Sequence, residues 1–328
     1  MQWFRHHGRE LPWRDTTDPY AIWLSEIILQ QTQVKQGWSY WERFVQRWPT
    51  AQALAAATED EVLREWQGLG YYSRARNLLT AARQVVATGG FPTTLEGIRQ
   101  LKGVGPYTAA AIASFAFGIR AAVVDGNVYR VLARHFGIAT PINTTEGKKE
   151  FALLAQQLLP GEETAVTAGS VAARYNQAIM DFGATQCTPQ APRCAGCPLQ
   201  ETCAAYRQGR VSELPVKLKK LKTRQRRLTY VYIRWQGRTA LHRRGPGDIW
   251  QGLWEPFIIE DGKMEIEAQC LVRNFRHVLT HQLLLADLYL LETDSRPDLP
   301  DDYIWVAETD IDRYALPRLV ERLLQFIA

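Results

Sequence analysis

The sequence lacks the features that carry a chain into or across a membrane. No apolar run reaches the roughly 20 residues that a spanning helix needs. The opening segment Met1–His7 has no long apolar core of the kind found in a secretory signal. We therefore expect an intracellular protein without membrane contact, which in a bacterium would be cytoplasmic and associated with the nucleoid.

Cysteine is scarce, and its distribution argues against a disulfide framework. The 328 residues include five cysteines, and four of them lie within residues 187–203. A disulfide framework spreads its cysteines over the chain and is typical of secreted domains. The clustering therefore indicates a metal site. The fifth cysteine, Cys270, stands alone, and we expect it to be a small buried hydrophobic residue.

The remaining composition is that of an ordinary globular protein. Hydrophobic residues make up 46% and charged residues 22% of the chain, which excludes a disordered or membrane-embedded protein. The net charge of +5 favours a polyanionic partner only slightly, because many basic enzymes bind no nucleic acid. The length suffices for two domains with separate cores, and no solenoid repeat is present. We expect a monomer.

Residues 1–208 are predicted to form a helical domain. Apolar residues recur three and four positions apart in Ala51–Glu65, Arg74–Ala87 and Thr108–Phe117, and glycine and proline separate these stretches. Residues 209–227 are predicted to be a basic interdomain linker, because Val216–Arg227 holds seven Lys and Arg residues and no acid. The linker is either a solvated tether or a tether that follows DNA phosphates.

Residues 228–328 are predicted to form a smaller α+β domain. Leu228–Trp235 and Leu283–Leu291 are rich in β-branched, aromatic and leucine residues, which is typical of strands. Turn signals such as Gly245–Asp248 separate such runs, and the amphipathic segment Leu316–Phe326 is predicted to be a final helix.

The clustered cysteines have the spacing C-x6-C-x2-C-x5-C, with Cys187, Cys194, Cys197 and Cys203. Four thiolates are the ligands that an iron–sulfur cluster requires. Zinc also takes four thiolates, but usually from two short pairs, and here only the middle pair is close. A zinc knuckle is the alternative.

A glycine-bearing turn joins two predicted helices within residues 101–109. Gly103 and Gly105 permit a tight turn, and Pro106 suits the first position of a helix. Backbone N–H groups at such a helix start can bind a phosphate without reading the base sequence. The alternative is an ordinary turn between helices.

Two carboxylic acids are candidates for catalysis. Glu26 lies in the apolar run Trp23–Thr32, which is predicted to be helical from near Pro19. It is either on a solvated helix face or desolvated, and desolvation would raise its pKa. Asp125 precedes a predicted helix as an N-cap, and in a functional role the helix N-terminus would hold it ionised.

Such a pair suits the cleavage of a glycosidic bond. A neutral acid protonates the departing group, and an anion stabilises the oxocarbenium ion that develops on the sugar. The spacing of Glu26 and Asp125 in the sequence alone does not show that they act as a pair.

The motifs resemble those of a known family. The cysteine spacing behind a helical domain is similar to that of the endonuclease III superfamily of helix-hairpin-helix DNA glycosylases. Four runs resemble the adenine DNA glycosylases called MutY: Leu11–Arg14, Trp23–Val34, Gly68–Asn77 and Val124–Val128. The resemblance implies a mainly α fold, in which a two-lobed helix-hairpin-helix domain carries a [4Fe–4S] cluster on the loop 187–203. It also implies hydrolysis of adenine opposite 8-oxoguanine or guanine in double-stranded DNA.

The resemblance also implies a role for each catalytic residue. Glu26 would be the general acid that protonates adenine and activates water, and Asp125 would stabilise the oxocarbenium ion. Tyr107 and Asn127 would orient Asp125 and the substrate. In lyase-type members a lysine occupies the position of Tyr107, and a phenol cannot form a Schiff base. We therefore expect base removal without efficient strand cleavage.

Further residues are implied to bind the DNA. A stacked base must be flipped out before it can react, at a cost of a few kcal/mol, and side chains that fill the gap offset this cost. Gln31 and Tyr71 would be these wedges, and Trp13 and Arg14 would help to line the adenine pocket.

The C-terminal domain resembles the MutT-like, or Nudix, domain of the same family, which reads the oxidised guanine. No run of the type G-x5-E-x7-R-E lies between Gly237 and Asp294, so we expect no nucleotide hydrolysis. Thr280 and His281 match a Phe-Ser-His motif and would contact the lesion, although Leu279 replaces its aromatic residue. His277 competes with His281 for this role.

Two other functions remain open. One is an endonuclease III-like glycosylase and lyase acting on oxidised pyrimidines, against which Tyr107 and the second domain argue. The other is a catalytically inactive protein that binds DNA damage, against which the presence of both Glu26 and Asp125 argues.

Overall fold

The chain folds into two compact units in the computed structural model, which describes residues 1–161, 170–218, 224–259 and 267–327. Unit 1 comprises Met1–Gln52 and Ala81–Lys219, and unit 2 comprises Ala53–Thr80 and Lys220–Ala328. Within the described ranges, no helix combines the length and apolarity that crossing a membrane requires.

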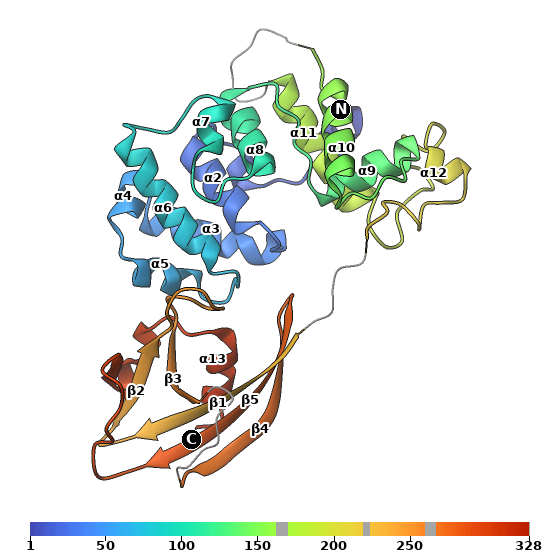
Figure 1. The fold of residues 1–328 in the computed structure, drawn as a ribbon. Coiled ribbons are helices and arrows are strands. Elements are labelled where there is room, and N and C mark those ends of the chain that lie inside the picture. Colours follow the sequence, from blue (N-terminus) through green and yellow to red (C-terminus); the bar gives the residue numbers. More distant parts are fainter. Residues whose placement is uncertain (162–169, 219–223, 260–266, 328) are drawn as a thin grey trace. The chain divides into compact units, whose positions relative to one another are not determined.

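Unit 1 is helical, as predicted (Figure 1). Its α-helices are α1 Gln2–His7, α2 Pro19–Ile28, α3 Val34–Arg47, α7 Leu95–Arg99, α8 Pro106–Phe117, α9 Gly126–Phe136, α10 Thr145–Leu158, α11 Val171–Asp181 and α12 Ala204–Arg207. A 3-10 turn η1 (Pro12–Arg14) precedes α2, and a π-helical turn η2 (Phe182–Gln186) follows α11. Helices α4 (Ala51–Ala56) and α6 (Ser73–Ala87) each continue from one unit into the other.

Helix α2 is the buried centre of unit 1 and packs against α8. Its start near Pro19 is confirmed: the Asp18 side chain caps it by accepting the N–H groups of Tyr20 and Ala21. The prediction that the helix continues to Thr32 is wrong, because α2 ends at Ile28. Gln31 has a left-handed backbone with φ of 61°, which a right-handed helix cannot contain.

The predicted helix Ala51–Glu65 is two helices, α4 and α5 (Glu59–Trp66). The break arises at Thr58, whose hydroxyl accepts the N–H of Glu61 while the Glu61 carboxylate accepts the N–H of Thr58. This capping box starts a new helix inside what is one continuous amphipathic pattern in the sequence. The helices predicted at Arg74–Ala87 and Thr108–Phe117 are confirmed in α6 and α8.

Unit 2 contains a six-stranded sheet in the order β4-β5-β1-β3-β2-β6. Neighbouring strands are antiparallel except β1 and β5, which are parallel. The α+β prediction for this region is confirmed. The strands are β1 Arg224–Arg234, β2 Arg238–Arg243, β3 Trp254–Ile259, β4 Gln269–Val278, β5 Gln282–Glu292 and β6 Tyr303–Ala307.

A final helix, α13 (Arg318–Leu324), packs on one face of this sheet after a 3-10 turn, η3 (Glu308–Arg313) (Figure 1). Leu228 and Tyr230 of β1 and Leu288 of β5 meet Leu319 and Leu323 of α13 in the core. The helix is shorter at both ends than the predicted Leu316–Phe326, because Pro317 is its N-cap.

Both described ends of the predicted linker 209–227 are folded. Leu214 is 2% exposed and packs in a core of unit 1, and the carbonyl of Val216 accepts the N–H of Ile142 at 3.0 Å. Strand β1 begins at Arg224, so the last basic residues of this segment belong to the sheet. Lys219, Lys220 and Lys222 lie outside the described residues.

The prediction that Cys270 is buried is wrong. Cys270 is exposed on β4, which lies at the edge of the sheet, and Arg273 Nε donates to its Sγ at 3.3 Å. The sequence pattern of a strand does not distinguish an edge position from a central one, and this difference decides the exposure.

Candidate active site

Glu26 is a desolvated acid on the buried helix α2. Its side chain is 7% exposed, so the interpretation as a residue on a solvated face is wrong. Burial raises the pKa of Glu26 to about 7, and the nearby charge of Asp125 adds to this rise. A hydrogen bond from the Tyr107 hydroxyl and the charge of Arg14 act in the opposite direction. Near neutral pH this carboxyl can therefore both hold and release a proton.

Asp125 is the N-cap of α9, as predicted. One oxygen of its carboxylate accepts the N–H groups of Asn127 at 2.9 Å and Val128 at 2.8 Å, and the other accepts the Asn127 amide at 2.7 Å. The expectation was that the helix start holds Asp125 ionised, and these hydrogen bonds favour the carboxylate. Burial raises the pKa of Asp125, although these hydrogen bonds and the charge of Arg130 oppose the rise.

Tyr107 is hydrogen-bonded to one carboxyl and lies near the charge of the other. It follows Pro106 at the start of α8, and its hydroxyl donates a hydrogen bond to Glu26. Burial and the charges of Glu26 and Asp125 raise the pKa of Tyr107 well above its usual value, so the phenol remains a proton donor. The fold thus brings Glu26, Tyr107 and Asp125 together from α2, α8 and the cap of α9.

A chain of hydrogen bonds leads from Asp125 to the cysteine loop. Asn127 Oδ1 accepts Arg130 Nη2 at 2.8 Å, and Arg130 Nε donates to the carbonyl of Cys187 at 2.6 Å. Gly183 packs against Asn127 so closely that an added Cβ would lie 2.6 Å from the Asn127 Cβ and 2.8 Å from its carbonyl oxygen. The position of Asp125 therefore depends on residues around the loop.

Asp181 is a further residue of this site, and no sequence motif pointed to it. Its carboxylate is 0% exposed at the end of α11 and accepts Arg14 Nη1 at 2.8 Å and Arg14 Nη2 at 2.7 Å. Arg9 Nε also donates to it, at 2.9 Å. Both arginines lower the pKa of Asp181 despite burial. Arg14, predicted to line a base pocket, is thus held by an ion pair close enough to influence Glu26.

Trp13, the other residue predicted at the base pocket, is 7% exposed. Its ring makes edge contacts with Trp38 at 5.7 Å and Trp41 at 5.6 Å between centroids. An aromatic wall of this kind excludes water from its surroundings.

The predicted wedge residues share an unusual backbone. Gln31 in unit 1 and Tyr71 in unit 2 are exposed and have left-handed φ angles of 61° and 47°. Such angles strain a residue that has a Cβ. Within unit 2, the hydroxyl of Tyr71 forms a hydrogen bond with the hydroxyl of Thr280.

Thr280 and His281 form the turn between β4 and β5, which the hydrogen bond from Leu279 N–H to the carbonyl of Gln282 closes at 2.8 Å. Both turn residues are exposed. The rival His277 packs instead against Trp250, with 6.2 Å between ring centroids. Leu279, at the position of the expected aromatic residue, packs against the core of unit 2.

The turn before α8 is open to a ligand. Gly103 has the left-handed φ of 78° that its turn requires. Gly105 caps α8 with an extended backbone, and a Cβ built on it would meet no atom within 4 Å. In the part of the chain that the structure describes, no protein group accepts the N–H of Gly103 or Gly105. Pro106 is the first helical residue, as predicted.

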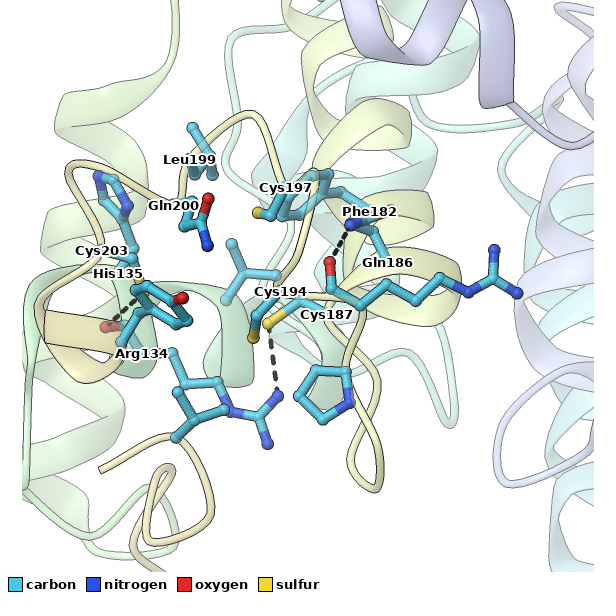
Figure 2. A pocket seen from close by; sticks show the side chains of 15 residues that line it. Arg134, His135, Phe182, Gln186, Cys187, Cys194, Cys197, Leu199, Gln200 and Cys203 are labelled. Atoms are coloured by element: carbon cyan, nitrogen blue, oxygen red, sulfur yellow. Dashed lines mark hydrogen bonds between the residues drawn. The ribbon is translucent and has the colours of Figure 1, made fainter. Parts of the chain in front are cut away.

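The clustered cysteines line one cavity of unit 1 together with Arg134 (Figure 2). Burial raises the pKa of the thiols of Cys194 and Cys197, and the neighbouring cysteines add to this rise. Among the described residues, no group of three or more His, Cys, Asp or Glu side chains is arranged to hold a metal ion. Four thiols at one cavity are the donor set that an iron–sulfur cluster requires, and zinc also takes four thiolates.

Comparison with family models defines the class of the chain. Residues 24–158 match the model of the HhH-GPD superfamily base excision DNA repair protein, and residues 229–326 match the NUDIX domain. The first match contains both carboxyls of the site and the turn at Gly103. The class is therefore a helix-hairpin-helix base excision repair protein with a C-terminal Nudix domain. Endonuclease III-like proteins commonly carry a [4Fe–4S] cluster.

Individual relatives narrow this class. The adenine DNA glycosylase of Buchnera aphidicola subsp. Baizongia pistaciae is 33% identical over 298 residues, covering 87% of this chain and 82% of the relative. That of Mus musculus is 44% identical over 233 residues, covering 66% of this chain and 43% of the relative. The chain belongs to the adenine DNA glycosylase family. It spans less than half the length of the mammalian relatives that it matches.

A solved structure of a thermostable thymine-DNA glycosylase is also similar. It superposes with a TM-score of 0.56 at 31% identity, covering 63% of this chain and 93% of that one. The helical fold is thus shared with a glycosylase that is named for a different base.

Proposed function

We propose that the chain is a monofunctional glycosylase that removes adenine paired with 8-oxoguanine or guanine in double-stranded DNA. One observation carries the proposal. A buried carboxyl with a pKa raised to about 7, Glu26, accepts a hydrogen bond from Tyr107 and lies near the charge of a second carboxyl at a helix start, Asp125. Membership of the adenine DNA glycosylase family supports the choice of base.

The first step breaks the bond between adenine and the sugar. Protonated Glu26 gives its proton to a ring nitrogen of the flipped adenine, and the electron pair of the C–N bond leaves with the base. The sugar becomes an oxocarbenium ion. Asp125 stabilises this cation, since its two backbone N–H bonds, the Asn127 amide and the charge of Arg130 all favour the carboxylate.

The second step adds water to the sugar. Glu26, which has lost its proton, accepts one from the attacking water, and the hydroxyl becomes attached to the sugar carbon. The acid is thereby restored. Tyr107 holds the Glu26 carboxyl through both steps and remains neutral, because its pKa is raised well above 10. No amine occupies its position, so the strand is left intact.

The remaining site residues are proposed to hold the DNA. The open N–H groups of Gly103 and Gly105 would bind a phosphate at the start of α8. Gln31 and Tyr71 would fill the gap left by the flipped base. Thr280 and His281 would contact the opposite guanine. The hydrogen bond between the hydroxyls of Tyr71 and Thr280 supports a joint role for these two residues at the lesion. Trp13 and Arg14 would border the adenine.

We also propose that the four cysteines of the loop, Cys187, Cys194, Cys197 and Cys203, hold a [4Fe–4S] cluster. The cluster would supply a rigid cross-link of the loop, and no step of the hydrolysis passes through it. The four thiols around one cavity support this proposal.

A single-turnover assay with the full chain tests the reaction. Duplexes with adenine opposite 8-oxoguanine, adenine opposite guanine, thymine opposite guanine or thymine glycol are incubated and quenched with and without hot alkali. We expect breaks only with the two adenine duplexes and only after alkali. Breaks without alkali would refute the monofunctional mechanism, and faster removal of thymine would refute the choice of base.

Two variants test the residues. Glu26→Gln is expected to abolish base removal, and the exposed Glu150→Gln on α10 serves as the matched control. Wild-type rates in Glu26→Gln would refute its role as the acid.

A further inference from the structure

Arg134 is a buried arginine with its guanidinium among the residues of the cysteine loop. Its side chain lies on α9, and the residue is 3% exposed. Nη1 donates to Cys187 Sγ at 3.4 Å and to the carbonyl of Thr188 at 2.7 Å. Nη2 donates to the carbonyl of Pro189 at 3.2 Å, and Nε donates to that of Leu214 at 3.0 Å. Figure 2 shows the contact between Arg134 and Cys187.

In the described ranges no ion pair joins the buried guanidinium of Arg134 to an aspartate or glutamate, whereas Arg14 is paired with Asp181. A buried cation is costly unless an anion lies beside it. The candidate anion is a sulfur, because one N–H of the guanidinium points to Cys187 Sγ. A thiolate at Cys187, as in a cluster, would supply the balancing charge.

We propose that Arg134 is a positioning residue that sets the reduction potential of the iron–sulfur cluster, an inference that rests on the cluster proposed above. Hydrogen bonds to the ligand sulfurs and the local net charge are the main protein controls of such potentials. The reduced cluster carries one more negative charge than the oxidised one. A fixed guanidinium beside a ligand sulfur therefore stabilises the reduced form and raises the potential.

Variants of the full chain with its cluster test this inference. The amounts of iron and sulfide per chain are measured first, and the midpoint potential is then measured by protein-film voltammetry without DNA. Arg134→Gln is expected to lower the potential, shifting the one-electron equilibrium at least tenfold toward the oxidised form, or about 59 mV. Arg134→Lys is expected to give a smaller shift, because lysine keeps the charge without the planar fork.

Arg120 offers a matched control. It donates to the carbonyls of Gln156, Leu159 and Pro160 and, within the described residues, to no sulfur. Arg120→Gln is expected to leave the potential unchanged. A fully loaded Arg134→Gln with the wild-type potential would overturn the inference, because a merely structural arginine gives that result.

The remaining outcomes are also decisive. If Arg134→Gln loses iron, the potential of the iron-loaded Arg134→Lys variant is compared with that of the wild type. A lower potential supports the inference, and an unchanged potential overturns it. The absence of iron from the wild-type chain would refute both the proposed cluster and this inference. A wild-type chain that holds iron but removes no base refutes only the proposed reaction.

Discussion

Replacing Glu26 by glutamine is expected to stabilise the fold while it abolishes base removal. In the folded chain burial raises the pKa of Glu26 from 4.5 to about 7. Between these two values the folded chain binds more protons than the unfolded chain, so stability falls as the pH rises. Above pH 7 the destabilisation of the folded chain by the ionised Glu26 reaches its full value. Each pKa unit corresponds to about 1.36 kcal/mol, so this destabilisation is about 3 kcal/mol.

Glutamine carries no charge at any pH and keeps a carbonyl that can accept the Tyr107 hydroxyl. The stability gained by Glu26→Gln should therefore be near zero below pH 4.5 and grow to about 3 kcal/mol at pH 8. Urea unfolding at several pH values, followed through a probe in unit 1, measures this gain. Glu150→Gln, at an exposed position, is the control. A gain that is absent at pH 8, or the same at every pH, would show that Glu26 is not a desolvated acid.

Four further outcomes are expected. The rate of base removal at low DNA concentration should fall about tenfold per pH unit above pH 7, as Glu26 loses its proton, in a single-turnover pH series. Asp125→Asn should keep the cap of α9, because asparagine caps helices, yet slow removal at least a hundredfold, with circular dichroism confirming the fold. Asp181→Asn should lower the unfolding free energy by about 3 kcal/mol, because the largely buried Arg14 and the partly exposed Arg9 lose their shared anion, and thermal melting measures this loss. Gly183→Ala should displace Asn127 and slow removal on the order of a hundredfold; a rate equal to wild type would show that the backbone moves aside freely.

Much of the fold and site could be predicted from local patterns. Apolar spacing located α6 and α8, and β-branched runs located β1 and β5. The acid Glu26 stood out because large apolar residues surround it in the sequence, and it is buried in the structure. The cap role of Asp125 followed from its place just before a helix.

Other features depend on contacts between distant segments. Asp181 is a lone acid at the end of an amphipathic helix, and only the fold brings Arg9 and Arg14 to it. The rise in the pKa of Asp125 could not be predicted, because it comes mainly from burial by elements distant in the sequence. Cys270 was placed wrongly because edge and central strands look alike in sequence.

The left-handed backbones of Gln31 and Tyr71 have a consequence for the evolution of this chain. Glycine would adopt these angles without strain, and for other residues they cost on the order of 1 to 3 kcal/mol. A library of variants selected only for survival at high temperature should therefore drift toward glycine at both positions. Variants selected for binding to a distorted duplex should retain glutamine and tyrosine. A comparison of the two selections would separate what folding requires at these positions from what DNA binding requires.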